Sequence, residues 1–542
     1  MSTRLQRCVL NGLLALGLIA PAFGANTTAD PKVLHFINRL SFGPTPGEVQ
    51  RVQSIGIERY IQEQLSPESI PQPPALSQQL ASFQTLNMMP SQLFEEYGPT
   101  KELKQMLLGQ FRKQQNLQNP SATPQTPQLT DEQKAAIKAQ RRRARIILEE
   151  ATTARLVRAV ESPSQLQEVM TDFWYNHFNV YSGKGLDRLW VGAYEQQAIR
   201  PYALGHFGDL VMFTASHPAM LFYLDNWQNT GANTPGARGR FKGLNENFAR
   251  ELMELHTLGV DGGYTQKDVT ELARVLTGWG FCRNGRRGLS YAFCFDASRH
   301  DSGEKLFLGQ TIKAGGPEEG AKAIALLVHS PVTARHISYE LAQYFVADNP
   351  PQSLVDKLTK RYLETDGDIR EMLNTLFHSS EFQDPKYYGA KFKSPYQYVV
   401  SSLRVSGQPV QNPLLVAAQL NQFGMPLYGC QTPNGYQNTE AAWLSPDALT
   451  RRISFATALA SGKLARLPKS PLISPQPEDG VMLPPEPPPK PVFSSFAQPL
   501  DPTQLANTLG NRFSPKTSAA LAKATPDLRG ALILASPEMM HY

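Results

Sequence analysis

Residues 245–259 read NENFARELMELHTLG and combine a helical pattern with a dense set of ionisable groups. At about 100° per residue, one side of such a helix is polar and comprises Asn247, Arg250, Glu251 and Glu254. The adjoining apolar stripe comprises Phe248, Leu252 and Leu255, and His256 falls roughly opposite Glu254. Because a buried charge must be paired or serve a function, we expect other elements to surround this helix.

The same periodicity extends to both sides of this stretch. Residues 164–461 form a succession of helical segments with short breaks and almost no alternating strand pattern. A long helix is expected over residues 130–160, and Thr265 and Asp368 each precede an apolar-periodic run as helix caps. The sequence therefore predicts an all-α fold, an irregular multi-helix assembly with proline-rich linkers and little or no sheet.

Composition and proline distribution divide the chain into regions. Of 542 residues, 41% are hydrophobic and 18% charged, which is typical of a globular protein, and many of the 43 prolines gather in linker-like stretches. Thr45, with Glu48 three residues later, is expected to cap a helix near the N-terminus. The predicted regions are a signal peptide (1–24), an N-terminal helical region (31–115), a polar Gln/Pro/Thr linker (116–130), a main helical domain (131–465), a proline-rich linker (466–500) and a C-terminal helical segment (501–542).

The first residues have the three parts of a secretory signal. Arg4 and Arg7 precede a short apolar run over residues 9–20, and small residues at Ala22 and Gly24 provide a cleavage site. The alternative is a transmembrane anchor, but the run is shorter than the ~20 residues that a spanning helix needs. We therefore expect an exported protein, periplasmic or secreted, without a transmembrane anchor.

Export affects the interpretation of the cysteines. Once Cys8 is removed with the signal, Cys282 and Cys294 remain on either side of a glycine-rich loop, and Cys430 is left over. In an oxidising compartment the first two predict a disulfide, the alternative being two free thiols, and Cys430 is expected to be free.

Several functional classes lose support from the sequence. The arginine cluster at residues 141–145 could contact nucleic acid, but an exported protein rarely meets it, which favours a solvated helix face and no nucleic-acid partner. The G-x-S-x-G, P-loop and G-x-G-x-x-G motifs are all missing, which removes sequence support for those hydrolase, NTPase and dinucleotide-binding classes.

Three segments together resemble a known bacterial family. Residues 36–45 (FINRLSFGPT), 172–178 (DFWYNHF) and, above all, 245–259 are similar to DUF1800, a domain of unknown function. The resemblance extends over almost the whole chain after the signal. It implies an exported, largely α-helical protein of unassigned activity. Such proteins are often found beside a second exported family that is similar to the alkaline-phosphatase and sulfatase superfamily, so we expect a partner of that class.

Two interpretations of the polar side of residues 245–259 remain open. In the functional one, Glu251 and Glu254 are a general acid–base pair and His177 converges on them as a third catalytic group. In the structural one, Arg250 pairs with Glu254 or with a carboxylate from elsewhere, and Asn247 satisfies a loop.

A metal-assisted version would make Glu251 and Glu254 metal ligands, with His256, His300 and Asp301 as further candidate ligands. The Glu-x-x-His pair of di-iron bundles and the H-E-x-x-H motif are both missing from the sequence. The cofactor is therefore unknown, and the sequence does not predict a particular metal ion. Two hypotheses for function follow. One is a hydrolytic or metal-assisted enzyme acting on an envelope or extracellular substrate, and the other is a non-catalytic binding or scaffold protein working with another exported protein.

Overall fold

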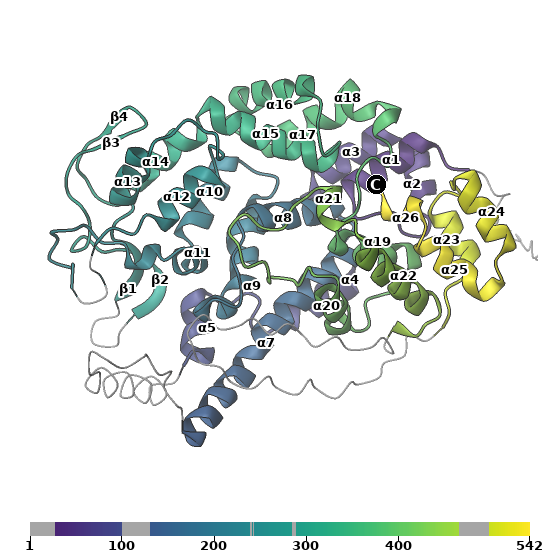
Figure 1. Cartoon of the computed structure of the whole chain (residues 1–542), viewed down its shortest axis with the longest axis horizontal. Helices are drawn as coiled ribbons and strands as arrows, with labels where there is room; N and C mark the ends of the chain where they lie inside the picture. Colours follow the sequence, from purple (N-terminus) through teal and green to yellow (C-terminus); the bar gives the residue numbers. More distant parts are fainter. Residues whose placement is uncertain (1–27, 100–129, 239–240, 242, 284–288, 465–497) are drawn as a thin grey trace, which may run out of the picture.

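The computed structural model describes residues 28–99, 130–238, 241, 243–283, 289–464 and 498–542 (Figure 1). It is 62% helical with only 4% strand, which confirms the all-α prediction. The signal segment, most of both linkers and residues 100–115 of the N-terminal region lie outside the described residues. Within the described residues, no helix combines the length and the apolar character that crossing a bilayer requires.

The N-terminal region is a set of short helices. They are α1 (Pro31–Leu40), α2 (Glu48–Ile55), α3 (Ile57–Leu65), η1 (Pro67–Ser69), α4 (Pro74–Ala81) and α5 (Pro90–Tyr97). Helix α2 begins at Glu48, after Gly47, so the cap predicted at Thr45 is wrong in position. The Thr45 amide and hydroxyl instead donate to the Glu48 carboxylate, at 2.8 and 3.0 Å.

The long helix α7 (Asp131–Glu161) confirms the prediction for residues 130–160. At its start, the Thr130 hydroxyl accepts from the Gln133 amide (3.3 Å) and the Gln133 side chain accepts from the Thr130 amide (2.8 Å), a reciprocal capping box. Near the other end, Arg155 is buried and ion-paired with Asp172 and Glu195, so α7 is anchored to the centre of the molecule.

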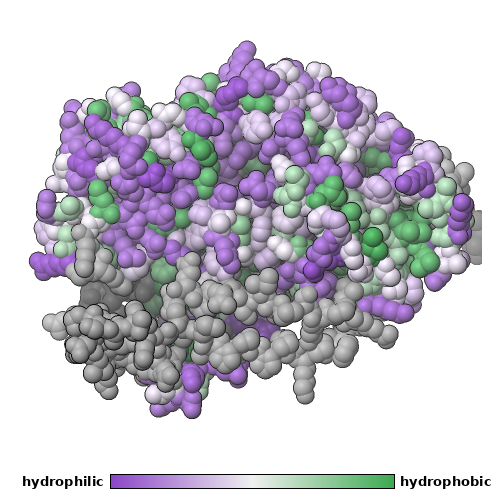
Figure 2. Space-filling model, in the orientation of Figure 1, coloured by the Kyte–Doolittle hydropathy of each residue, from purple (hydrophilic) through white to green (hydrophobic). Residues whose placement is uncertain are grey.

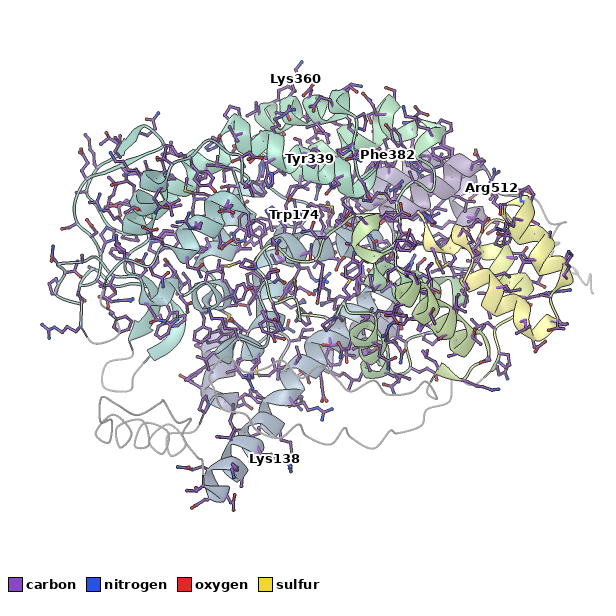
Figure 3. All side chains as sticks on the ribbon, viewed as in Figure 1. Lys138, Trp174, Tyr339, Lys360, Phe382 and Arg512 are labelled. Atoms are coloured by element: carbon purple, nitrogen blue, oxygen red, sulfur yellow. The ribbon has the colours of Figure 1, made fainter. Side chains whose placement is uncertain are left out.

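The centre is built around α8 (Gln165–His177), which is buried over almost its whole length. Trp174 on this helix is fully buried and lies in the middle of the molecule, whereas Lys138, Lys360 and Arg512 lie at its periphery (Figure 3). The helices and turns that follow are η2 (Gly185–Leu189), α9 (Val191–Tyr194), the π-helical turn η3 (Glu195–Ile199), η4 (Arg200–Tyr202), α10 (Phe207–Ser216), α11 (Pro218–Tyr223), η5 (Asn226–Gln228), α12 (Asn247–Glu254) and α13 (Gln266–Val275).

Two small antiparallel hairpins make up the sheet. Strand β1 (Trp279–Arg283) pairs with β2 (Leu289–Phe295), and β3 (Lys305–Phe307) pairs with β4 (Gln310–Ile312). The first hairpin pairs Gly280 with Cys294 and Phe281 with Phe293. Both hairpins lie at one end of the molecule, β3 and β4 next to α13 and α14 (Glu318–Val328), and β1 and β2 next to α11 (Figure 1).

The second half of the chain is again helical. It comprises α14 (Glu318–Val328), α15 (Pro331–Phe345), α16 (Gln352–Glu364), α17 (Ile369–His378), α18 (Ser380–Gln383), η7 (Pro385–Tyr387), α19 (Pro395–Ser406), α20 (Pro413–Gln422), α21 (Glu440–Trp443) and α22 (Pro446–Ala460). The helix caps predicted at Thr265 and Asp368 are confirmed. The Thr265 side chain accepts from the Asp268 amide at the start of α13, and the Asp368 side chain accepts from the Glu371 amide at the start of α17.

The C-terminal segment packs beside the N-terminal helices (Figure 1). It consists of α23 (Pro502–Thr508), α24 (Pro515–Lys523), α25 (Pro526–Leu534) and α26 (Pro537–Met540). The Ala29 amide donates to the Gly510 carbonyl (2.9 Å), and His541 forms an antiparallel bridge with Phe392. Residues predicted as three helical regions therefore bury one continuous apolar core.

Candidate functional site

Helix α12 is shorter than the motif that contains it. It runs from Asn247 to Glu254, after which the His256 amide donates to the Glu251 carbonyl (3.1 Å) and the Gly259 amide to the Met253 carbonyl (3.2 Å). Gly259 adopts a φ of +87°, which favours glycine and closes the turn. The prediction that His256 lies opposite Glu254 on one helix is therefore wrong, because the turn takes His256 off the helix and buries it at 1% exposure.

Arg250 does not pair with Glu254. Its guanidinium lies 3.4 Å from the Glu246 carboxylate, one turn earlier, and donates to the Gln266 side chain at 2.8 Å. Glu246 also accepts from Gln266 (2.7 Å) and from the Thr270 hydroxyl (2.8 Å). This network joins α12 to α13 and leaves the Glu251 and Glu254 carboxylates outside it.

Asn247 satisfies a loop carbonyl. Its side-chain amide donates to the Leu224 carbonyl (3.3 Å) at the end of α11, while its backbone amide donates to the Asn245 side chain (3.0 Å). These contacts hold the start of α12 against the preceding helix.

Glu251 and Glu254 lie close enough to affect one another. Burial, followed by the negative charge of Glu254, raises the pKa of the Glu251 carboxyl, and Arg250 only partly opposes this shift. The Tyr264 hydroxyl donates to Glu254 at 3.3 Å. The pair is thus a half-buried carboxyl couple in which Glu251 holds a proton more readily than an ordinary glutamate.

The structure brings His177 together with His256, His336 and Glu340, which we call the histidine centre. His177 ends α8, His256 follows α12, and His336 and Glu340 lie one turn apart on α15. His177 Nδ1 lies 2.7 Å from Glu340 Oε2, and His177 Nε2 lies 3.2 Å from the His256 carbonyl oxygen. The ring centroid of His177 is 6.0 Å from that of His256 and 6.5 Å from that of His336.

Both ring nitrogens of His177 face oxygen atoms, Nδ1 the Glu340 carboxylate and Nε2 the His256 carbonyl. Burial acts to raise the pKa of Glu340, but the charge and hydrogen bond of His177 hold it below its ordinary value. His177 is 4% exposed at its side chain and Glu340 30%, so the pair reaches solvent through Glu340.

His336 and His256 are neutral neighbours of this pair. Burial is the main cause that lowers the pKa of each ring, and His177 adds to the shift. His336 also hydrogen-bonds the Leu255 backbone, and its Nε2 lies 3.7 Å from Glu340 Oε1. Among the described residues, neither His336 Nε2 nor His256 Nε2 has a hydrogen-bond partner. The side chain of His336 is 25% exposed, but its Nε2 atom is itself buried.

Glu251 and Glu254 adjoin the histidine centre in sequence but are not joined to it by contact. His256 is two residues beyond Glu254, yet neither carboxylate contributes to the pKa shifts of His256 or His336. The three predicted catalytic residues Glu251, Glu254 and His177 therefore lie in two adjacent groups. The carboxyl of the histidine centre is Glu340.

His300 and Asp301 belong to a different cluster. His300 Nδ1 lies 2.9 Å from the Thr277 carbonyl oxygen, and its Nε2 lies 3.2 Å from Glu319 Oε1. Lys305 Nζ lies 2.6 Å from Glu319 Oε2, with both side chains at 0% exposure. Asp301 forms a two-point ion pair with Arg274 at 2.9 and 3.1 Å. This enclosed network fastens β3 to α13 and α14.

The metal candidates do not converge. His256 belongs to the histidine centre, whereas His300 and Asp301 belong to the cluster around Glu319 and Arg274. The three predicted metal ligands therefore do not meet at one point. In the described part of the chain, no group of three or more His, Cys, Asp or Glu side chains is placed to hold a metal ion.

Cys294 is disulfide-bonded, and Cys430 is a buried free cysteine. Cys282, the predicted partner of Cys294, lies on β1 of the same hairpin, but its side chain lies outside the described residues.

A loop and an ionic network hold the end of α8 in place. The Asn176 side chain exchanges hydrogen bonds with the Tyr436 backbone at 2.7 and 2.8 Å, and the Asn179 side chain donates to the carbonyls of Cys430 and Thr432. On the other side, Arg155 pairs with Asp172 and with Glu195, the latter at 3.2 Å. His177 is therefore presented from a fixed helix end.

Sequence reasoning missed His336 and Glu340. Their signal is the four-residue spacing within HISYE, which places both side chains on one face of a helix. That spacing is common on ordinary helices and by itself indicates no site. It becomes part of a site only because α15 packs against the ends of α8 and α12.

No curated protein and no solved structure matches the chain. The family model described as a protein of unknown function, DUF1800, matches residues 35–541, which include every residue of the histidine centre and of the carboxyl couple. The chain therefore belongs to the DUF1800 family.

Proposed function

We propose that this protein is an exported hydrolytic enzyme whose proton transfers take place at His336, beside the His177–Glu340 ion pair. The observation that supports this most is the state of His336. Burial lowers the pKa of its ring, its side chain is 25% exposed, and its buried Nε2 has no hydrogen-bond partner among the described residues, next to the close contact of His177 with Glu340. A neutral imidazole with a free nitrogen is the form that acts as a general base.

Each group has a role in this proposal. His336 Nε2 takes a proton from an attacking water and returns it to the leaving group. Glu340 faces both His336 and His177, so its negative charge stabilises the imidazolium that forms on His336. His177, which is buried, holds Glu340 in place and lowers the pKa of its carboxyl.

The carboxyl couple supplies a second proton-handling group. Glu251, with its raised pKa, is suited to donate a proton, and Glu254 is held by Tyr264. The proposed proton transfers use only these side chains and water, and they make no assumption about a bound metal ion.

The proposed substrate class and cellular compartment rest on the signal peptide predicted at residues 1–24. An exported enzyme, periplasmic or secreted, acts on envelope or extracellular material, and the family resemblance favours cooperation with a second exported protein of the sulfatase-like or alkaline-phosphatase-like class. Both statements are part of the proposal.

Turnover by a matched pair of variants tests the proposal. The full chain is incubated with envelope material and with chromogenic ester, phosphate-ester and glycoside substrates, and released products are measured by absorbance and mass spectrometry. We expect His336→Gln to lower turnover ~100-fold or more. His378→Gln, at an exposed histidine paired with Glu58 at 2.7 Å, should leave it unchanged. Equal turnover by His336→Gln and the unaltered protein contradicts the proposal.

An exposed apolar surface favours the alternative of a binding or scaffold protein. Ile453 on α22 is 51% exposed, and Leu528 and Leu532 on α25 are 50% and 38% exposed. Figure 2 shows hydrophobic side chains gathered over this part of the molecule. Apolar patches of this kind often mark protein partners. Loss of partner capture on Ile453→Asp, with no turnover of any substrate by the unaltered protein, would support this alternative over the enzyme.

A further inference from the structure

A small cavity lies between α1, α8, α15, α19 and the last residue of the chain. Its volume is about 10 Å³, which accommodates one water-sized particle. The polar side chains that line it include Arg39, Lys393, Gln397, Tyr344 and Tyr542. Two of these are cations, and the lining contains no carboxylate among the described residues.

Arg39 is a buried guanidinium with unused donors. It is 1% exposed, and one terminal nitrogen donates to the carbonyls of Val346 (3.2 Å) and Tyr387 (2.8 Å). Its Nε and Nη1 have no hydrogen-bond partner among the described residues. The guanidinium carbon lies 4.7 Å from the centre of the Tyr542 ring, which provides a cation–π contact and no acceptor for these N–H groups.

Lys393 is a second buried cation at the same cavity. It is 4% exposed, and its Nζ donates to the Ser401 hydroxyl (2.8 Å) and the Met539 carbonyl (2.9 Å). An ammonium group has three N–H donors, so one is left over. Burial, followed by the charge of Arg452, lowers the pKa of Lys393 to about 7.

The nearby carboxylates are already paired with other cations. Asp348 pairs with Lys391 and accepts from the Glu440 amide (2.8 Å), and Asp172 pairs with Arg155. No carboxylate contributes to the pKa shifts of Arg39 or Lys393. Arg39, and Lys393 when it is protonated, are therefore buried positive charges without a nearby negative side chain among the described residues, an arrangement that is costly unless something else compensates it.

We propose that this cavity binds one small monovalent anion, chloride, through the free N–H groups of Arg39 and Lys393. The small size of the cavity favours a halide over larger anions. Bound chloride supplies the missing negative charge and holds α1 against α19 and the C-terminal residues. Its role is structural, and it is independent of the proposed hydrolytic site.

Thermal unfolding of the full chain tests this proposal. Chloride is titrated at constant ionic strength against gluconate, which is too large for the cavity. We expect a saturable rise in the unfolding midpoint of about 2 °C. Lys393→Met should abolish the rise, while Lys360→Met, at an exposed lysine with 77% side-chain exposure, should retain it. Equal chloride effects in both variants, or no chloride effect in the unaltered protein, would overturn the proposal.

Crystals of the unaltered protein soaked in bromide give a test that does not depend on the folding of a variant. We expect an anomalous peak in the cavity, within hydrogen-bonding distance of Lys393 Nζ and Arg39 Nη1. A water molecule at this position, without anomalous signal at saturating bromide, would mean that Lys393 is neutral and that the site is not an anion site.

Discussion

His177 Nδ1 and Glu340 Oε2 lie 2.7 Å apart, although α8 and α15 are far apart in the sequence. This ion pair closes the histidine centre, since it fixes the ring of His177 and sets Glu340 beside His336. The end of α8 is held in place by independent contacts, the ionic network of Arg155 and the loop that contains Tyr436.

Breaking this pair should destabilise the fold. We expect Glu340→Gln to lower the free energy of unfolding by about 2 kcal/mol, less than the ~3–5 kcal/mol of a fully buried pair, because Glu340 is 30% exposed. Denaturant unfolding measures the change. Glu364→Gln, at a glutamate 48% exposed and 3.7 Å from Lys360, is the control and should change stability by less than ~0.5 kcal/mol. Equal effects of the two substitutions would contradict the assignment of a buried ion pair.

The enclosed pair of Lys305 and Glu319 should matter more for stability. Both side chains are 0% exposed, so Lys305→Met leaves Glu319 without its lysine and with His300 and the Gly315 amide as its remaining partners, and we expect a loss of ~3 kcal/mol. Calorimetry of the single variant and of Lys305→Met with Glu319→Gln checks this, because removing both charges should restore part of the loss. A double variant less stable than the single one would show that breaking the Lys305–Glu319 ion pair does not cause the loss of stability.

Two helical glycines should respond in opposite ways to alanine. A Cβ on Gly320 in α14 would lie 2.0 Å from the Trp279 ring, so Gly320→Ala must displace that side chain and should cost about 2–3 kcal/mol. A Cβ on Gly208 in α10 would lie 3.5 Å from Val328, an ordinary contact. Gly208→Ala should therefore be neutral or stabilising by up to ~1 kcal/mol, as is usual in a helix. Thermal unfolding of both variants measures the contrast, and a stabilising Gly320→Ala would contradict the packing of Trp279.

Buried His217 should make the fold sensitive to acid. Burial lowers its pKa to about 3, while the unfolded chain protonates it near 6.5. Between these values the unfolded state binds more protons, so stability falls as pH decreases, by about 1.4 kcal/mol per pH unit for this residue.

The variant His217→Asn isolates that contribution. Asparagine keeps an acceptor for the Ala219 amide, which His217 Nδ1 caps at 3.2 Å, and it does not titrate. We expect a shallower loss of stability between pH 6 and 4 for the variant in denaturant unfolding, with the contribution of His35, whose pKa burial also lowers to about 3, still present. Parallel curves for the two proteins would show that His217 is protonated without unfolding.

The helical class of the protein and many of its helix starts could be predicted from the sequence. The caps at Thr130, Thr265 and Asp368 depend on contacts within four residues, and the buried face of α12 follows from helical spacing, so local pattern was sufficient. Local pattern failed at Thr45, where Gly47 with a φ of +84° starts the helix instead.

The candidate site depended on contacts that the sequence does not encode locally. Residues 245–259 look like one helix, but the positive φ of Gly259, packed against His336, ends that helix early and turns His256 inward. Residues Glu251 and Glu254 are neighbours on a helix, so their coupling was predictable, whereas the partner of His177 was not.

The sequence by itself determined which segments are helical, which faces they bury and where most of them begin, because these properties arise from the periodicity of side chains and from local hydrogen bonds. Only the tertiary structure decided that His177 pairs with Glu340 and that His336 is left with a free nitrogen. Those outcomes depend on how the end of α8, the turn after α12 and the middle of α15 approach one another, and that approach is set by the packing of the whole core.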